Sequence, residues 1–223
     1  MTNDVATRRQ GRIAGVVYLG VVITGIFTLA YAPGQFTIPG DAAATARAVH
    51  ENRALVLGAA ASGVAMSAFY LALPVVLARF LSSYGRLAAR LMVGFVAVST
   101  PFMLIALFQY WRLAGLSAAG APDAPSVSAL LSEYKTYERL ASIFWGLWLA
   151  PLGYLVLKSG AIPRILGVLL LCGCVGYVAG YFGPMVYAGY RDIPFMSYFS
   201  KLGSIGEIGT CLWLLVMGAR GRR

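Results

Sequence analysis

The stretch that decides the fold covers residues 138–187 and reads ERLASIFWGLWLAPLGYLVLKSGAIPRILGVLLLCGCVGYVAGYFGPMVY. It consists of two apolar segments joined by a short turn that carries Lys158, Gly160, Pro163 and Arg164. Each segment has about the length of the roughly 20 apolar residues that a helix needs to cross a bilayer. A basic turn crosses lipid with difficulty and marks the cytoplasmic side. The stretch therefore predicts a transmembrane helical hairpin with a cytoplasmic turn.

The composition of the whole chain agrees with a membrane protein. Of its 223 residues, 59% are hydrophobic and 12% are charged, whereas soluble domains carry roughly 25% charged residues. The net charge of +10 comes from Lys and Arg residues at the ends of apolar segments, which form no continuous basic face. We therefore expect membrane lipid as a partner and no nucleic acid. The three cysteines lie inside apolar segments, which argues against a disulfide framework.

Working outward from the hairpin, the same pattern predicts one membrane domain over residues 1–223. It is an all-α, polytopic bundle of six transmembrane helices at about residues 13–31, 54–78, 91–111, 140–157, 165–187 and 202–218. We expect Pro33, Gly34, Pro39 and Gly40 to break the first helix and Pro101 to kink or loosen the third. Asp41 should cap a short surface helix over residues 42–52. The loop over residues 117–137 should be external and carry a short helix.

The first apolar segment has a second interpretation, a cleaved signal peptide. Ala30 and Ala32 flank Tyr31 in a small-x-small pattern, and Arg8 and Arg9 are paired as in twin-arginine export signals. The apolar run is longer than the usual 7–15 residues of a signal peptide, and the residues that normally follow the paired arginines are missing. We therefore favour a retained transmembrane helix.

The distribution of charges tests the six-helix plan separately from hydropathy. The segments placed inside hold eleven Lys or Arg residues and one acid, whereas those placed outside hold seven bases and seven acids. The whole positive charge thus falls on the inner side, as the positive-inside rule requires. We expect both termini to be cytoplasmic.

Two patterns of small residues concern helix packing. Gly58, Ser62 and Met66 follow a four-residue step that favours close helix contact in lipid. In addition, Arg12-Ile-Ala-Gly-Val opens the first predicted helix, and Arg164-Ile-Leu-Gly-Val opens the fifth. We favour a shared pattern of membrane entry, with a basic anchor followed by a small residue, over an internal duplication.

The hairpin resembles a known family. The pattern LGYLVLKSGAIPRILGVLL at residues 152–170, followed by Gly176 and Tyr177, is similar to bacterial membrane proteins grouped as domain of unknown function 4386. R-x-A-G-V-x-Y-L at residues 12–19 and PGDAAAT at residues 39–45 fit the same family. The resemblance covers most of the chain and implies a polytopic helical protein. It implies no activity and assigns no catalytic residue.

The motifs of the common cofactor and metal enzymes are missing. The chain has no phosphate-binding Gly-rich loop, no dinucleotide fingerprint, no His-Glu-x-x-His and no Asp-rich diphosphate motif. It has one histidine, His50, which we interpret as a loop or interface residue. We therefore expect no cofactor and no metal site.

Polar and aromatic residues gather at the predicted outer ends of the helices. Glu207 is the most informative of them, because an acid inside an apolar span is costly and usually faces a bundle interior or a wet cavity. We assign Glu207 and Glu138 as candidate catalytic acids. The candidate substrate-binding residues are Trp145, Trp148, Tyr177, Tyr181, Arg112, Gln109 and Trp111.

Each of these assignments has a structural alternative. Glu207 could pair with Arg112 or Arg139 to hold helices together. The Trp and Tyr residues could form an interfacial belt against lipid headgroups.

Three functions fit this pattern. The first is a membrane enzyme that takes a lipophilic small molecule and cyclises an isoprenoid after protonation, as small polytopic terpene cyclases do. An aromatic pocket stabilises the passing carbocation, and a low-dielectric site favours the neutral form of its acid. The second is a small transporter or channel subunit with a Glu207 and Arg112 gate, which would have to act as a homodimer. The third is a sensory or binding subunit without chemistry.

Overall fold

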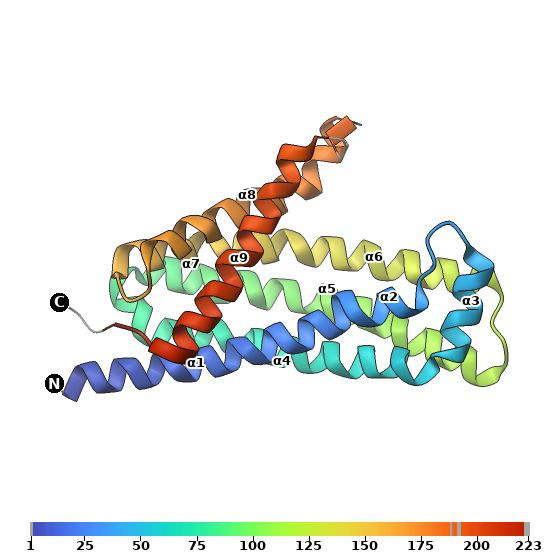
Figure 1. The fold of residues 1–223 in the computed structure, drawn as a ribbon, viewed down its shortest axis with the longest axis horizontal. Helices are drawn as coiled ribbons and strands as arrows, with labels where there is room; N and C mark the ends of the chain where they lie inside the picture. Colours follow the sequence, from blue (N-terminus) through green and yellow to red (C-terminus); the bar gives the residue numbers. More distant parts are fainter. Residues whose placement is uncertain (1, 188, 191–192, 221–223) are drawn as a thin grey trace. The chain divides into compact units, whose positions relative to one another are not determined.

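The computed structural model describes residues 2–187, 189–190 and 193–220, and in this part of the chain it contains helices and no strand (Figure 1). Four charged residues used in the charge pattern, Arg191, Asp192, Arg222 and Arg223, lie outside the described residues. The regular elements in chain order are α1 (Thr2–Ile26), the π-helix η1 (Phe27–Tyr31), α2 (Ala32–Phe36), α3 (Ala42–Glu51), α4 (Arg53–Leu81), the 3-10 helix η2 (Ser82–Tyr84), α5 (Arg86–Ala119), α6 (Ala124–Leu147), α7 (Leu149–Ser159), α8 (Arg164–Val186) and α9 (Pro194–Met217).

Five helical runs among the described residues are long and apolar enough to cross a membrane. They are Thr7–Phe36, Arg53–Tyr84, Arg86–Ala119, Ala124–Ser159 and Arg164–Val186. Large apolar side chains such as Val16, Leu87 and Ile165 are exposed on these runs, as expected where lipid is the solvent. The chain is therefore a multi-pass, all-helical membrane protein. The sixth predicted span falls on α9, and its role as a span stays a prediction.

The first helical run ends later than predicted. Pro33 was expected to end it, but the helix continues to Phe36. The π-helix η1 ends two residues before this proline, and its wider turn is closed by the Ala32 N–H, which donates to the Phe27 carbonyl. Pro33 then occupies the first turn of α2, where a missing N–H costs little. The chain turns at residues 37–41, where two of the predicted breakers, Pro39 and Gly40, lie and Gly40 has φ 79°.

The predicted external loop over residues 117–137 is mostly helical. Helix α6 begins at Ala124 and continues without a break into the segment predicted to start at residue 140. Asp123 caps it, since its carboxylate accepts hydrogen bonds from the hydroxyl and the backbone N–H of Ser126 at 3.1 and 2.9 Å. These bonds hold the pKa of Asp123 below its ordinary value, the hydroxyl contributing most.

The break between α6 and α7 has a local cause. Pro151 has no N–H to donate to the Leu147 carbonyl four residues earlier, and its ring crowds that carbonyl. Helix α6 ends at Leu147, and α7 begins at Leu149. Trp148 lies in the break. In contrast, α4 and α5 continue through Pro74 and Pro101.

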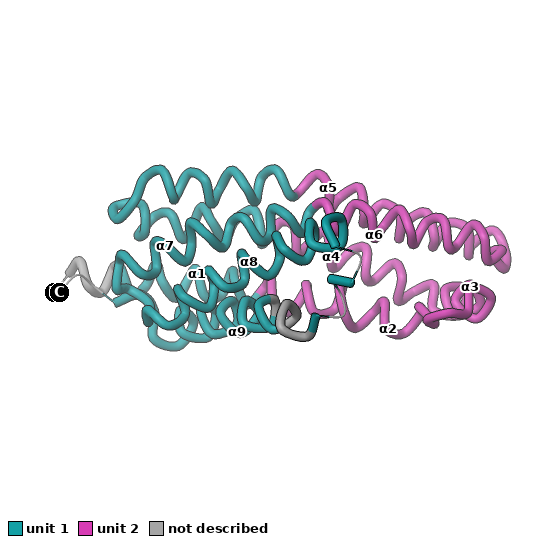
Figure 2. The backbone as a smooth tube through the Cα atoms, turned by 90° about the horizontal axis from the view of Figure 1, so that it is seen from above, with its two compact units in different colours: residues 1–19, 69–99, 141–223 teal, residues 20–68, 100–140 magenta. Residues whose placement is uncertain are grey.

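The chain divides into two compact units (Figure 2). Unit 1 comprises residues 1–19, 69–99 and 141–223, and unit 2 comprises residues 20–68 and 100–140. Helices α1, α4, α5 and α6 contribute residues to both units.

In unit 2 the stripe of Gly58, Ser62 and Met66 lies against another helix as predicted, at ordinary van der Waals distance. The Ser62 hydroxyl donates to the Thr24 carbonyl at 3.2 Å. A methyl group added at Gly58 would lie 3.7 Å from the Phe27 ring, and one added at Gly25 would lie 3.4 Å from the Met66 sulfur. This stripe of α4 therefore packs against the end of α1 and the start of η1.

Glycines also set the packing of unit 1. A methyl group added at Gly203 of α9 would lie 2.5 Å from the Cα atom of Gly173 of α8. A methyl group added at Gly15 of α1 would lie 2.6 Å from the Cα atom of Leu215 of α9. Helix α9 thus meets α8 and α1 at backbone contact, which small residues permit in lipid.

Candidate functional site

The first candidate site lies in unit 1 and is formed by Tyr18, Tyr70, Trp148 and Glu207, called here the carboxylate cluster. Glu207 lies on α9 thirteen residues after Pro194, the first residue of the helix. It was expected near the start of its helix, but α9 begins eight residues before the predicted start. The Tyr18 hydroxyl of α1 donates a hydrogen bond to Glu207 Oε1 at 3.5 Å, a long distance for such a bond.

Trp148 is the centre of the aromatic part of this cluster. Its side chain is 1% exposed. Its ring meets the ring of Tyr70 edge to face, with centroids 5.4 Å apart, and that of Tyr18 with centroids 6.2 Å apart. Both are favourable geometries for aromatic pairs. The break that Pro151 causes therefore places an indole ring between two tyrosines, one of which holds Glu207.

Several polar atoms near Glu207 are buried without a hydrogen bond among the described residues. They are the Tyr70 hydroxyl, the Trp148 indole nitrogen and the hydroxyl of Thr210, which follows Glu207 by one helical turn. A buried polar group without a partner is costly, and in a native structure it needs an explanation. The cluster therefore combines one ionisable acid, aromatic faces and polar atoms that a guest molecule or water could satisfy.

The other predicted residues of unit 1 relate to this cluster in different ways. Tyr177 lies within electrostatic range of Tyr18 and Tyr70, and its side chain packs where Gly146 leaves space. Tyr181 contacts Phe182 of its own helix, with ring centroids 5.0 Å apart. Trp145 is partly exposed. Trp148 and Tyr177 are thus the predicted lining residues that the described contacts bring near Glu207.

The second candidate site is a pocket of about 650 Å³ in unit 2, called here the unit 2 pocket. This volume is within the roughly 300–1,000 Å³ of small-molecule sites. Its lining comes from η1, α2, the turn over residues 37–41, α3, α5 and α6. The residues are Leu29, Pro33, Thr37, Ile38, Pro39, Gly40, Asp41, Ala42, Thr45, Tyr110, Ser128, Leu131, Ser132, Tyr134, Lys135, Thr136, Glu138 and Arg139.

The turn that forms one wall of this pocket is held by hydrogen bonds. Asp41 caps α3 as predicted, because its carboxylate accepts from the Ala44 N–H at 2.8 Å. The buried Thr45 hydroxyl accepts from the Ile38 N–H at 2.9 Å and lies 2.9 Å from the Asp41 carbonyl, to which it can donate. The wall is therefore built before any ligand arrives.

Another wall of the pocket is aromatic and charged. The rings of Tyr110 and Tyr134 stack with centroids 4.2 Å apart, and Phe36 meets Tyr110 edge to face at 5.6 Å. Glu138 lies on the same wall and is close enough to Lys135 and Arg139 to interact with both electrostatically. One predicted acid thus lies in a pocket with two cations.

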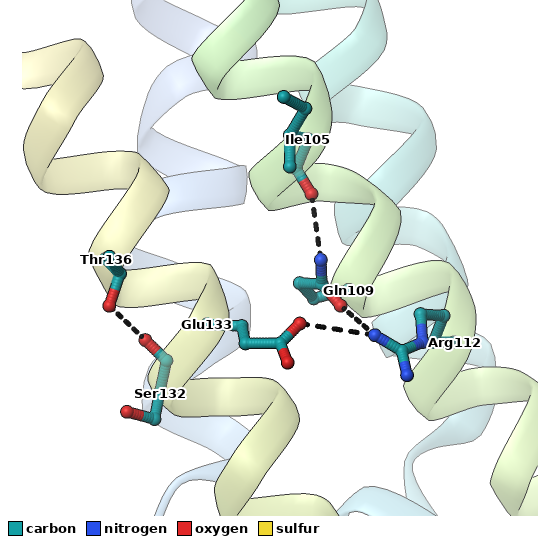
Figure 3. A network of polar contacts seen from close by, with 6 residues as sticks. All are labelled: Ile105, Gln109, Arg112, Ser132, Glu133 and Thr136. Atoms are coloured by element: carbon teal, nitrogen blue, oxygen red, sulfur yellow. Dashed lines mark hydrogen bonds and ion pairs between the residues drawn. The ribbon is translucent and has the colours of Figure 1, made fainter.

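Gln109 and Arg112 belong to a separate polar network in unit 2 (Figure 3). Arg112 Nη1 donates to Gln109 Oε1 at 2.9 Å and to Glu133 Oε2 at 3.2 Å, and Gln109 Nε2 donates to the Ile105 carbonyl at 3.3 Å. The ion pair of Arg112 is therefore with Glu133, in place of the suggested Glu207. Both partners are about half exposed, and such pairs contribute roughly 0–1 kcal/mol.

The predicted residues thus fall into groups with different surroundings. Glu207 lies in the carboxylate cluster of unit 1, whereas Glu138 lies in the unit 2 pocket. A common pocket for both acids stays a prediction. Trp111 is 63% exposed, in keeping with the interfacial-belt alternative. Among the described residues, no three His, Cys, Asp or Glu side chains gather so that they could hold a metal ion.

Sequence reasoning missed Tyr18 and Tyr70, although each carries a signal. Both are tyrosines that lie inside long apolar segments, away from the ends of those segments. A tyrosine hydroxyl in such a place needs a polar partner. Their pairing with Glu207 and Trp148 depends on how α1, α4 and α9 pack, which periodicity does not reveal.

Comparisons with known proteins place the chain in a family without an assigned activity. An uncharacterized protein of Archaeoglobus fulgidus is 34% identical over 92 residues, which are 40% of this chain and 51% of that relative. The match therefore spans about half the length of the relative. No solved structure matches the chain. A family model described as Domain of unknown function (DUF4386) matches residues 13–218. Since this match covers nearly all of the sequence, the protein belongs to the family described as Domain of unknown function (DUF4386).

Proposed function

We propose that this protein is a membrane enzyme that isomerises a lipophilic substrate, with Glu207 as the acid that starts the reaction. The reaction that suits the site best is the proton-initiated cyclisation of a linear isoprenoid. The observation that carries the proposal is the hydrogen bond from Tyr18 to Glu207 beside the ring of Trp148.

The proposed step needs no oxidant, reductant or second substrate. The O–H bond of Glu207 breaks and a C–H bond forms at one carbon of a double bond. The π electrons of that double bond make the new bond and leave a cation on the neighbouring carbon. A second double bond attacks this cation to close a ring, and a C–H proton returns to the Glu207 carboxylate. The product is an isomer of the substrate, and the acid is restored.

Each residue of the carboxylate cluster has a role in this step. The Tyr18 hydroxyl donates to the carboxylate that remains after proton transfer and so stabilises it. The faces of Trp148 and Tyr70 stabilise a passing cation through their π electrons. Tyr177, within electrostatic range of both tyrosines, adds a further aromatic wall.

A second candidate function, proton-coupled transport, is favoured by the buried polar atoms. The Tyr70 hydroxyl, the Trp148 nitrogen and the Thr210 hydroxyl lack partners among the described residues. Water or an ion moving past Glu207 would satisfy them, as in proton relays of membrane pumps.

Both candidate functions come with a proposed topology in the membrane. We propose that α9 is the sixth span, that both termini are cytoplasmic and that the protein resides in a bacterial cytoplasmic membrane. The excess of Lys and Arg on one side of the span plan supports this orientation.

The test uses the purified full chain in detergent with linear isoprenoid alkenes in deuterated water. We expect a cyclic isomer that carries deuterium at a carbon atom, because Glu207 exchanges its proton with solvent. Glu207→Gln should slow the reaction about 10²–10⁴-fold, the usual range for a lost general acid. Glu133→Gln, which makes the same change in an exposed surface ion pair, should leave the rate unchanged.

The outcomes separate the two candidate functions. If no isomer forms and proteoliposomes instead show a proton flux that Glu207→Gln abolishes, transport replaces cyclisation. If an isomer forms at the same rate with Glu207→Gln as with the unaltered chain, Glu207 is not the acid.

A further inference from the structure

The unit 2 pocket has a composition unlike that of a hydrocarbon site. Its apolar lining, Leu29, Pro33, Ile38 and Leu131, is accompanied by two acids and two bases. Cations in the lining would oppose a carbocation, so this pocket does not suit the chemistry proposed for Glu207. An apolar surface beside paired charges of both signs suits an amphipathic ligand.

The charges are arranged by the helix and by the turn. Lys135 and Arg139 are four residues apart on α6, so they share one side of the helix. Glu138 lies between them in sequence and interacts with both. Asp41 reaches the pocket from the N-terminus of α3. The lining therefore holds two cations and two acids, which come from different elements of unit 2.

A buried hydroxyl in the lining makes no well-formed hydrogen bond. Tyr134 is 4% exposed, and no partner among the described residues meets hydrogen-bond geometry with its hydroxyl. The neighbouring Tyr110 hydroxyl interacts with it electrostatically and as a weak hydrogen bond outside that geometry. Because Tyr134 lines the pocket, a polar ligand inside it would supply the missing bond.

We infer that the unit 2 pocket is a binding site for a zwitterionic head group that joins a phosphate ester to an ammonium. The phosphate lies against Lys135 and Arg139, and the ammonium lies against the carboxylates of Asp41 and Glu138. The Tyr134 hydroxyl donates to a phosphate oxygen. An acyl chain attached to the head group extends out of the pocket along its apolar lining. This site is separate from the proposed function, which depends on Glu207.

The net charge of the pocket lining favours a zwitterionic head group over an anionic one. Lys135 and Arg139 are balanced by Asp41 and Glu138, so a purely anionic head group would meet two carboxylates without compensation. Contacts between like charges would strongly disfavour binding of the anionic head group. A zwitterion of suitable length satisfies both signs at once.

The test measures binding to the full chain in detergent by native mass spectrometry. The probes are phosphatidylethanolamine, phosphatidylglycerol and soluble glycerophosphoethanolamine. We expect phosphatidylethanolamine to bind about tenfold or more tightly than phosphatidylglycerol. Binding of soluble glycerophosphoethanolamine at comparable affinity identifies a free zwitterion as the ligand, whereas binding of the lipid alone identifies a membrane lipid.

Matched variants locate the site. Lys135→Gln and Glu138→Gln should each weaken binding about tenfold, the effect of one lost charge-assisted bond. Lys158→Gln and Glu133→Gln make the same changes outside the pocket lining and should not alter binding. Equal binding of the zwitterionic and anionic lipids, or an equal loss with pocket and control variants, would overturn the inference.

The hydroxyl of Tyr134 provides a second test that does not depend on charge. Tyr134→Phe should weaken binding of the zwitterion several-fold. In the ligand-free protein it should leave the melting temperature nearly unchanged or higher, because the buried hydroxyl that it removes makes no well-formed hydrogen bond. A fall in the ligand-free melting temperature together with unchanged binding would contradict the assignment.

Discussion

At the scale of single residues, the loss of the hydroxyl group should have opposite effects on stability at Tyr18 and at Tyr70, although both rings contact Trp148. The Tyr18 hydroxyl holds Glu207, whereas the Tyr70 hydroxyl is buried without a partner. Tyr18→Phe should therefore destabilise the protein by about 0.5–2 kcal/mol, since a buried carboxyl group loses its hydrogen bond. Tyr70→Phe should leave stability unchanged or higher. Thermal unfolding of the detergent-solubilised chain measures both variants.

The comparison of the two variants controls for the loss of a hydroxyl from the same aromatic group. Both remove one oxygen and retain a ring against Trp148. Equal losses of stability would mean that the Tyr70 hydroxyl is satisfied by a water or a ligand. The prediction would then be wrong, and the transport candidate would gain support.

At the scale of helices, the crossing of α8 and α9 depends on glycine. A methyl group at position 203 would lie 2.5 Å from the Gly173 Cα atom, a backbone contact that no side-chain rotation relieves. Gly203→Ala should therefore destabilise the protein by about 1–3 kcal/mol, as overpacking does. Gly94→Ala in α5 meets nothing within 4 Å and should stabilise it by about 0.5–1 kcal/mol.

The same substitution, glycine to alanine, should change stability in opposite directions at positions 203 and 94, which makes the prediction specific. Melting temperatures of the two variants in the same detergent should lie on opposite sides of the value for the unaltered chain. Two variants with equal effects would show that helix propensity, and not the contact with Gly173, governs position 203.

The two Arg-Ile-x-Gly-Val patterns have a related explanation at this scale. Gly15 approaches the backbone of Leu215, and Gly167 approaches the Gly153 carbonyl, where an added methyl group would lie 3.0 Å away. Each glycine permits close contact with a different helix. A small residue at a helix contact therefore explains the glycine of each pattern, whereas the choice between shared membrane entry and duplication stays a prediction.

At the scale of the whole molecule, the proposed topology places both termini in the cytoplasm. A C-terminal green fluorescent protein should fluoresce, and a C-terminal alkaline phosphatase should be inactive, because the first matures in the cytoplasm and the second requires the periplasm. A matched pair of fusions in the α3 region should show the reverse. An active C-terminal phosphatase would mean that the described helices cross an odd number of times.

The sequence by itself determined the class of the protein and much of its helix plan. Long apolar segments bounded by basic residues have few physical solutions, because lipid leaves no backbone group without an internal partner. The hairpin over residues 138–187, the cap at Asp41 and the small-residue stripe at Gly58 followed from such local rules. Pro33 and the predicted loop over residues 117–137 did not follow, since a π turn and a capping aspartate changed the local outcome.

The tertiary structure alone decided which polar residues meet. Two acids that share a chemistry, Glu207 and Glu138, lie in different surroundings, one held by Tyr18 and the other in a pocket with Lys135. The partners of each acid come from helices distant in sequence, and lipid-facing and core-facing residues are equally apolar in such helices. Hydrophobic periodicity therefore could not say which face of α1 or α4 points inward, and only the packing of the helices identified Tyr18 and Tyr70.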